Sequence, residues 1–324
     1  HRKGKSMWHY IVMALGWIIK SIYNLVQNYG VAIILFTIVM KLLLLPLNIK
    51  SQKAMKKQQK IQPLLAELQK KYANDQQKLQ QETMKLYKEN NVSMMGGCLP
   101  VLLQMPILIA LYQAIQKPLT YMFNVPHKEI PQDVINKIVG IAEKAGQAIP
   151  EKASEYGSYV SNLMQTRQID ISSWAGQVGG KLHDWYINFN FLGLDLSRKP
   201  QEALSALSDP LNNISVVLLI LIPILAIVSS VLQSKISMKQ SGQDKVKNDQ
   251  TQSMNSMMKW MMPLMTGWFT FILPAGIGLY WIISGIVQIV QQLALNYYFE
   301  KKGEDFVVKV PEKRTQHGKK GKKH

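Results

Sequence analysis

The sequence contains a single cysteine, Cys98, and its five longest apolar runs contain no aspartate, glutamate or histidine. One cysteine excludes an intramolecular disulfide. Carboxylates inside apolar runs are the usual parts of proton and cation pathways, so their absence disfavours a cation-coupled transporter. Cys98 follows Gly96 and Gly97 at the start of an apolar run, where we expect it to pack as a small hydrophobe rather than to react.

Sequence motifs of enzymes are also missing. The chain has no HExxH helix for zinc, no GxSxG nucleophile elbow and no P-loop, so it lacks these routes to hydrolysis. Ser229 and Ser230 are neighbours in an apolar run, but that run contains no histidine to activate a hydroxyl. We therefore expect a protein that is not an enzyme and that needs no cofactor or metal ion.

What the sequence does contain is five nearly pure apolar stretches separated by polar, lysine-rich segments, a division that the mean hydropathy of −0.03 conceals. Uncharged runs of about 20 residues are long enough to cross a bilayer as helices. The sequence therefore predicts an all-α integral membrane protein with five transmembrane helices, at residues 30–49, 97–123, 214–234, 258–274 and 276–299. The fourth is short, which local thinning of the bilayer would accommodate.

The formal net charge of +18 is unevenly distributed along the chain. Segment 50–92 carries 10 Lys and 4 acidic residues, and the tail 301–324 carries 9 Lys or Arg and 3 acidic residues. Segment 125–213, by contrast, carries 8 basic and 10 acidic residues. Because basic connections usually face the cytoplasm, we expect a multi-pass protein of a bacterial plasma membrane with its N-terminus outside and its C-terminus in the cytoplasm.

The connections between the spans divide the chain into parts. We expect a leader with an amphipathic interfacial helix at 1–29, the first two spans with a cytoplasmic helical hairpin (50–92) at 30–124, an extracytoplasmic insertion at 125–213, spans three to five at 214–300, and a basic cytoplasmic tail at 301–324. The hairpin has a thin apolar seam around Ile61, Leu65 and Leu68, so we expect it to be mobile. The alternative is a solvated loop without a partner.

Residues 8–27 carry an apolar stripe at helical spacing, with polar residues on the opposite side. The stripe consists of Ile11, Leu15, Ile18, Ile22 and Leu25. This pattern predicts an amphipathic helix lying in the outer interface of the membrane. A sixth span, with the basic residues before it on the cytoplasmic side, is the alternative.

Lys41 is the one charged residue in the apolar run 30–49. A cation near the middle of a span costs roughly 2.5–3.5 kcal/mol and usually faces protein or water. The alternative is snorkelling, in which the side chain carries its ammonium to the interface. The cytoplasmic charge begins at Lys50, which lies about 13 Å away along a helix, beyond the comfortable reach of one side chain.

Uncharged polar side chains lie on particular faces of the predicted spans. Tyr280, Ser284 and Gln288 recur at every fourth residue, so they share one side of the last span. We predict a wet groove lined by Lys41 together with Thr37, Gln104, Ser229, Ser230, Gln233, Tyr280, Ser284, Gln288 and Gln291. The alternative is helix–helix hydrogen bonding, at about 0.6 kcal/mol for each bond.

Three stretches resemble a known family: the end of the first span with KLLLLPLNIKSQKAM (41–55), GGCLPVLLQMPILIALYQAI (96–115) and KWMMPLMTGWFTFILPAGIGLYWIISGIVQIVQQ (259–292). They are similar to the YidC-type membrane protein insertases of the YidC–Oxa–Alb family. The resemblance covers about 30–124 and 190–300, and the combination of LLQMPI with LPAG and LYW is specific.

The resemblance implies a function without catalysis. Five helices would enclose a hydrophilic groove that is open to the cytoplasm and to lipid, and a cation on the first span would attract the polar or acidic segment of a nascent membrane protein. Lys41 occupies that position here, whereas bacterial members more often carry Arg. Lysine keeps the charge but lacks the planar fork of arginine.

The family and the charge distribution together suggest partners. We expect nascent membrane proteins as clients, ribosomes bound by the hairpin and the basic tail, anionic lipids near the lysines, and the Sec translocon as a possible partner. Two other classes of function stay open on the sequence: an anion channel or transporter that uses Lys41, and a non-catalytic assembly chaperone for membrane complexes.

Overall fold

The computed structural model describes residues 7–92, 99–116, 121–123, 130–144, 146, 148–155, 160, 187–204, 214–241 and 257–302. Nearly all of the regular structure in these ranges is helical, so the prediction of an all-α protein is confirmed. The main helices are α1 (Met7–Val26), α2 (Tyr29–Leu43), α3 (Leu45–Lys71), α4 (Gln76–Glu89), α5 (Leu99–Gln116), α7 (Gln132–Lys144), α11 (Pro200–Leu204), α12 (Ile214–Ser241), α14 (Met262–Ile272) and α15 (Ala275–Lys301).

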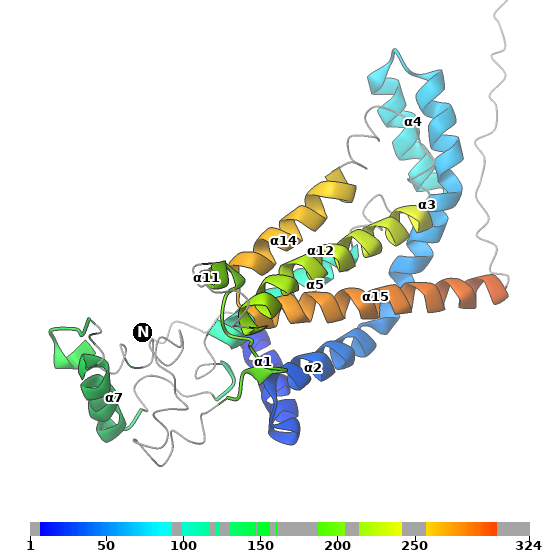
Figure 1. The fold of residues 1–324 in the computed structure, drawn as a ribbon. Coiled ribbons are helices and arrows are strands. Elements are labelled where there is room, and N and C mark those ends of the chain that lie inside the picture. The colour runs from blue at the N-terminus through cyan, green and yellow to red at the C-terminus, as the bar shows by residue number, and fades with distance from the viewer. Residues whose placement is uncertain are drawn as a thin grey trace, which may run out of the picture.

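The helices α2, α5, α12, α14 and α15 form an elongated bundle (Figure 1). Within it, α12 packs against α14 and α15, and α15 also packs against α2. The helical hairpin α3–α4 extends from one end, here called the hairpin end. The other end carries a short antiparallel pair of strands, β1 (Asn190–Phe191) and β2 (Leu194–Asp195), and is here called the strand end.

The first predicted span is bent rather than straight. Helix α2 ends at Leu43, and α3 continues after a bend of 62°. Pro46 lies in the first turn of α3 and has no N–H, so the carbonyl of Leu42 has no donor four residues later. The bend lies inside the predicted span 30–49 and directs the chain from the bundle into the hairpin.

The fourth predicted span, 258–274, is also irregular. Residues Met257–Met261 form a π-helical turn, and the regular helix α14 has 11 residues. Pro263 in the first turn of α14 lacks the N–H that a continuous helix needs, which favours a change of helical type at this point. Helix α12, by contrast, continues from Ile214 to Ser241, beyond the predicted boundary at 234.

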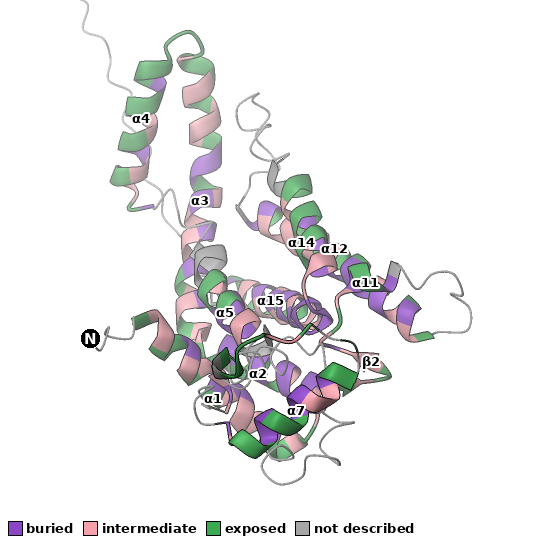
Figure 2. Ribbon diagram, turned by 90° about the vertical axis from the view of Figure 1, so that its left-hand side faces the viewer, coloured by how far each residue is buried: buried purple, intermediate pink, exposed green. Residues whose placement is uncertain are grey.

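The hairpin matches its sequence prediction closely. Helix α3 ends at Lys71, and α4 begins at Gln76 after a short turn. Its core consists of Ile61, Leu86 and Val92, with Leu64, Leu65, Leu68 and Tyr87 packed around them. The remaining faces are largely exposed, most of all on α4 (Figure 2), so few apolar contacts hold the hairpin together.

The strand pair ties the bundle together at the strand end, which the sequence did not indicate. Asn28 caps α2 by accepting from the N–H of Val31, and its Nδ2 donates to the carbonyl of Asn190 at 3.0 Å. The N–H of Tyr29 donates to the carbonyl of Asn188, whose own N–H donates to the hydroxyl of Tyr23 on α1. Two segments distant in sequence, 23–29 and 188–190, are therefore joined by hydrogen bonds.

The same segment completes the first turn of α15. The N–H groups of Ala275 and Gly276 donate to the carbonyls of Arg198 and Leu196, at 2.8 and 2.7 Å. The first N–H groups of a helix have no partner within it, and leaving them unpaired in an apolar region is costly. The segment 196–198 therefore satisfies a helix end that side chains do not cap.

Helix α1 runs across α2 and α15 rather than along them in both views (Figures 1 and 2). It packs against α2 and α5, and its buried residues are Val12, Gly16, Ile19 and Tyr23. By length and composition, three of the described helices (α1, α12 and α15) could cross a membrane, and the bent pair α2–α3 adds a fourth. The five spans expected from the sequence therefore stay a prediction, as does the interfacial placement of α1.

Close approach of α12 to α15 and α14 depends on glycine. A methyl group added at Gly285 would lie 2.2 Å from Oγ of Ser229, and one added at Gly278 would lie 2.3 Å from Cγ2 of Ile222. Gly267 on α14 meets Ile227 in the same way. Small residues at these positions let the backbones approach closely, which drives helix association in a bilayer.

We predict that Gly285→Ala destabilises the protein by about 1–3 kcal/mol, because the new methyl group overlaps the hydroxyl of Ser229. The measurement is thermal unfolding in detergent. Adding Ser229→Ala should restore most of the loss, since Cβ of Ser229 would lie 3.5 Å from the new methyl group. The control is Gly140→Ala, where nothing lies within 4 Å. Equal melting temperatures for Gly285→Ala and the parent protein would contradict the prediction.

Candidate functional site

Lys41 lies on the buried face of α2 and contacts two neighbouring helices. Its side chain is 8% exposed. The ammonium donates to Oε1 of Gln288 on α15 at 3.0 Å and to Oε1 of Gln104 on α5 at 3.3 Å. The ammonium therefore points into the bundle, and the geometry does not support snorkelling.

The amide of Gln104 is held in place by the last helix. Its Nε2 donates to the hydroxyl of Tyr280 and, at 3.2 Å, to Oγ of Ser284. Tyr280, Ser284 and Gln288 lie at every fourth residue of α15 and are all buried. These bonds turn the oxygen of Gln104 toward Lys41, so one network joins α2, α5 and α15.

Gln291 extends this network to the bend between α2 and α3. Its Nε2 donates to the backbone carbonyl of Lys41 at 3.1 Å, and its Oε1 accepts from Nδ2 of Asn48 at 3.2 Å. Carbonyls near the end of a helix lack partners within it, so the amide of Gln291 supplies one. Asn48 was not among the predicted site residues, although a polar residue one turn past the bend is a visible signal.

The remaining predicted residues lie outside this network. Thr37 is fully buried, but its hydroxyl donates to the carbonyl of Ile33 in its own helix at 2.7 Å. Ser229 and Gln233 on α12 face Gly285 of α15. Ser230 is half-buried on the same helix. The structure therefore places these α12 residues at the contact with α15 rather than at the ammonium.

A second contact between α12 and α15 was not predicted. Nε2 of Gln292 donates to Oγ of Ser237 at 3.1 Å, and Gln292 is 2% exposed. Ser237 lies two turns after Ser229 on α12, so the polar face of that helix continues toward the hairpin end. The sequence carried this signal in the spacing of Ser229, Gln233 and Ser237.

The chemistry of the site is that of a cation held by neutral groups. Both partners of the Lys41 ammonium are amide oxygens, and the ammonium has three N–H donors. A carboxylate brought to this place would form a charge-assisted hydrogen bond, which is stronger than a bond to an amide. Among the described residues, no group of His, Cys, Asp or Glu could hold a metal ion.

Comparison with known proteins places the chain in a family. The model of the family described as 60Kd inner membrane protein matches residues 21–302. Membrane protein insertase YidC 2 of Listeria innocua is 31% identical over 301 residues, which cover 91% of this chain and 74% of that protein. Membrane protein insertase YidC of Caldanaerobacter subterraneus subsp. tengcongensis is 33% identical over 282 residues, covering 87% and 92%.

Shorter matches reach higher identity. Membrane protein insertase YidC of Clostridium tetani is 51% identical over 119 residues, which cover 37% of this chain and 50% of that protein.

We predict that Tyr280→Phe lowers the free energy of unfolding by about 1 kcal/mol, because the amide of Gln104 then loses a buried acceptor. The matched control is Tyr297→Phe on the same helix, where the side chain is 68% exposed and the change should stay within about 0.5 kcal/mol. Thermal unfolding of the two purified variants in the same detergent compares them. Equal stabilities would mean that the Tyr280 hydroxyl does not support the network.

Proposed function

Because this chain belongs to the 60Kd inner membrane protein family, whose relatives are named membrane protein insertase YidC, we propose that it inserts nascent membrane proteins into the lipid bilayer. Its apolar helices make it an integral membrane protein. The observation that carries the proposal beyond the family is the buried Lys41 ammonium, held by two neutral amides.

The physical difficulty in insertion is the polar segment that must cross to the other side. Its charges and backbone groups lose water in hydrocarbon, at a cost of several kcal/mol for each unsatisfied group. Lys41, Gln104 and Gln288 offer such a segment a cation and hydrogen-bonding amides within the bundle. We propose that this site receives the polar or acidic segment from a groove open to the cytoplasm.

Release of the client into lipid supplies the driving force. Burying the apolar segment of the client contributes about 25 cal/mol for each Å² removed from water. Exposed apolar side chains on α12 and α14, including Val228, Leu264 and Trp268, form a surface suited to lipid tails or to that segment. No cofactor or catalytic residue enters this mechanism.

The orientation of the chain follows from its charges. We propose that the basic hairpin α3–α4 lies in the cytoplasm of a bacterial cell, together with the tail 301–324, most of which lies outside the described residues. The strand end then faces outward, with the insertion 125–213. Ribosomes and anionic lipids are the proposed partners of the cytoplasmic lysines, and the Sec translocon is a further candidate.

We predict that Lys41→Ala slows insertion of a client with an acidic translocated segment roughly tenfold, because one charge-assisted hydrogen bond is lost. Lys41→Glu should be worse, and Lys41→Arg should retain activity. Protease protection of a short single-span client in proteoliposomes measures the rate. Lys152→Ala, an exposed change in the insertion, is the control. If Lys41→Ala inserts acidic and uncharged clients at the same rate, Lys41 does not attract the charge of the client.

We also predict that water reaches the site. Single cysteines at Gln104, Ser284 and Gln288, in a Cys98→Ser background, should react with a membrane-impermeant thiol reagent added from the cytoplasmic side. A cysteine at Ile286, which is 49% exposed on another face of α15, should react far less, because lipid covers that face. Uniformly unreactive site positions would mean that the network is dry helix–helix bonding.

A third prediction concerns ribosomes. The hairpin carries ten lysines in 50–92, so its binding to RNA phosphates should weaken steeply and log-linearly as salt rises. Co-sedimentation in neutral detergent without anionic lipid measures this. Charge reversal at the exposed Lys70 and Lys71 should lower the salt slope, whereas truncation after Gly303 tests the tail separately. Unchanged binding in both variants would mean that these lysines orient the chain in the membrane or bind lipid headgroups, and do not bind ribosomes.

A further inference from the structure

Four buried glutamines have amide oxygens without hydrogen-bond partners. One of them, Gln58 on α3, bonds the side chain of Tyr87 within the hairpin, and the other three lie closer to the bundle. They are Gln52 on α3, Gln240 on α12 and Gln292 on α15, and their exposed fractions are 3%, 8% and 2%. Oε1 of each lacks a partner, and so does Nε2 of Gln240. Buried polar groups are nearly always paired, so three such amides are unusual. We call these residues the amide cluster.

The contacts of α15 bring the three helices together at this point. Gln291 of α15 accepts from Asn48 of α3, and the adjacent Gln292 donates to Ser237 of α12. Positions 291 and 292 therefore face two different helices.

The other two members of the cluster follow these contacts by one turn. Gln52 lies four residues after Asn48, and Gln240 lies three residues after Ser237, so each shares the face of its helix that makes the contact. The unpaired amides thus lie on the faces that α3, α12 and α15 turn toward one another, beyond the Lys41 network in the direction of the hairpin.

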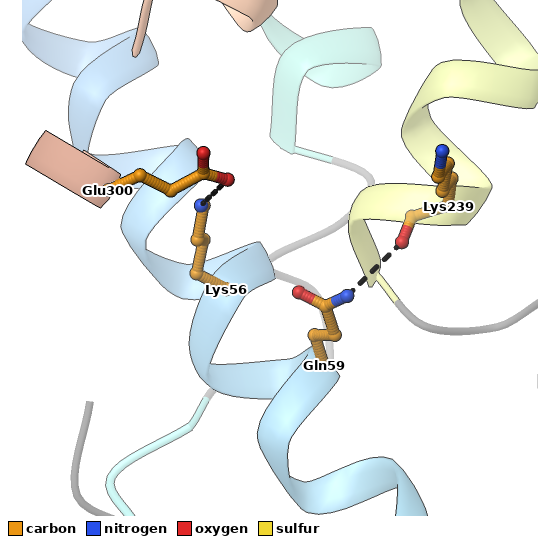
Figure 3. Close-up of polar contacts among 4 residues, drawn as sticks. All are labelled: Lys56, Gln59, Lys239 and Glu300. Carbon is orange, nitrogen blue, oxygen red and sulfur yellow. Dashed lines mark hydrogen bonds and ion pairs between the residues drawn. The ribbon is translucent and has the colours of Figure 1, made fainter. Parts of the chain in front are cut away.

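Just past the cluster, the Lys53 ammonium of α3 lies 5.5 Å from the centroid of the Phe299 ring on α15. Two weak polar contacts also join α3 to the other helices there (Figure 3). Nε2 of Gln59 donates to the carbonyl of Lys239 on α12 at 3.4 Å, and Nζ of Lys56 lies 3.7 Å from Oε1 of Glu300 on α15. The side chain of Glu300 is 75% exposed, and exposed ion pairs stabilise little. An entering ligand can therefore displace these contacts without a large loss of stability.

The unpaired atoms define the chemistry of that ligand. Three amide oxygens accept hydrogen bonds and one amide nitrogen donates. A carboxylate would meet mostly oxygen acceptors here, whereas a peptide backbone presents both N–H donors and carbonyl acceptors at every residue. The cluster therefore suits uncharged polypeptide backbone and differs from the cationic site at Lys41.

We infer that the amide cluster is a second client subsite, which hydrogen-bonds the peptide groups of an extended polar segment irrespective of its sequence. The inference rests on the proposed insertase function and deepens it. A segment entering from the hairpin end passes Gln52 and Gln240 before it reaches Lys41. The cluster thereby replaces the water that the backbone loses, and Lys41 recognises charge.

The experiment uses two clients in proteoliposomes that differ only in the translocated segment. One segment repeats Ser-Ala and the other repeats Ser-Pro. Each proline lacks the backbone N–H that would donate a hydrogen bond to the glutamine oxygens. The variant is Gln52→Met together with Gln240→Met, which keeps side-chain length and removes the amides. The matched control is Gln76→Met with Gln77→Met, two exposed positions on α4. Initial rates of protease protection are compared with the parent protein.

We expect the variant to insert the Ser-Ala client about fivefold more slowly than the parent protein, with the Ser-Pro client affected much less and the control unchanged. A benzophenone amino acid at position 240, but not at position 77, should also crosslink to the polar segment of a stalled client. Unchanged rates, equal slowing of both clients, or no crosslink from position 240 would overturn the subsite.

Two further outcomes can be distinguished from those above. A third client, with a lysine-rich segment, tests for recognition of charge. If the variant slows it more than the Ser-Ala client, the oxygens recognise cations, which overturns the assignment to backbone. If the parent protein protects neither client better than protein-free liposomes, the insertase function itself fails, and the subsite fails with it.

Discussion

The ammonium of Lys41 imposes the constraint on which the rest of the bundle depends. A charged group this deeply buried needs hydrogen-bond acceptors, and Gln104 on α5 and Gln288 on α15 supply them. Gln104 is in turn oriented by Tyr280 and Ser284. Satisfying one cation therefore fixes how α2, α5 and α15 face one another.

The two ends of the bundle are held by different kinds of contact. At the strand end, backbone hydrogen bonds from 188–198 reach α2 and α15, and Asn28 adds a side-chain bond. At the hairpin end, α3 meets α12 and α15 through side chains: Asn48 bonds Gln291, Lys53 lies over the ring of Phe299, and an ion pair and a 3.4 Å bond follow at Lys56 and Gln59. Regions with few buried contacts open most easily. This difference supports the proposed entry of a client at the hairpin end.

Part of the site could be read from sequence, because helical spacing decides which residues share a face. The recurrence of Tyr280, Ser284 and Gln288 predicted one side of α15, and the lone charge at 41 predicted a buried cation. Spacing does not decide which helix that face meets. Thr37 has the right spacing from Lys41, yet its hydroxyl bonds within its own helix, and Asn48 joins the network because the chain bends at Leu44. The roles of all these residues in insertion stay predictions.

The sequence by itself determined the class of the molecule: an all-α membrane protein with a basic helical hairpin, because apolar run length and charge distribution are local properties. The tertiary structure decided that the segment 188–198 completes the ends of α2 and α15. It also decided which amides are paired and which are left free, since hydrogen bonds such as Gln104 to Tyr280 join residues far apart in the chain. Local patterns carry no information about such partners, which only packing brings within bonding distance.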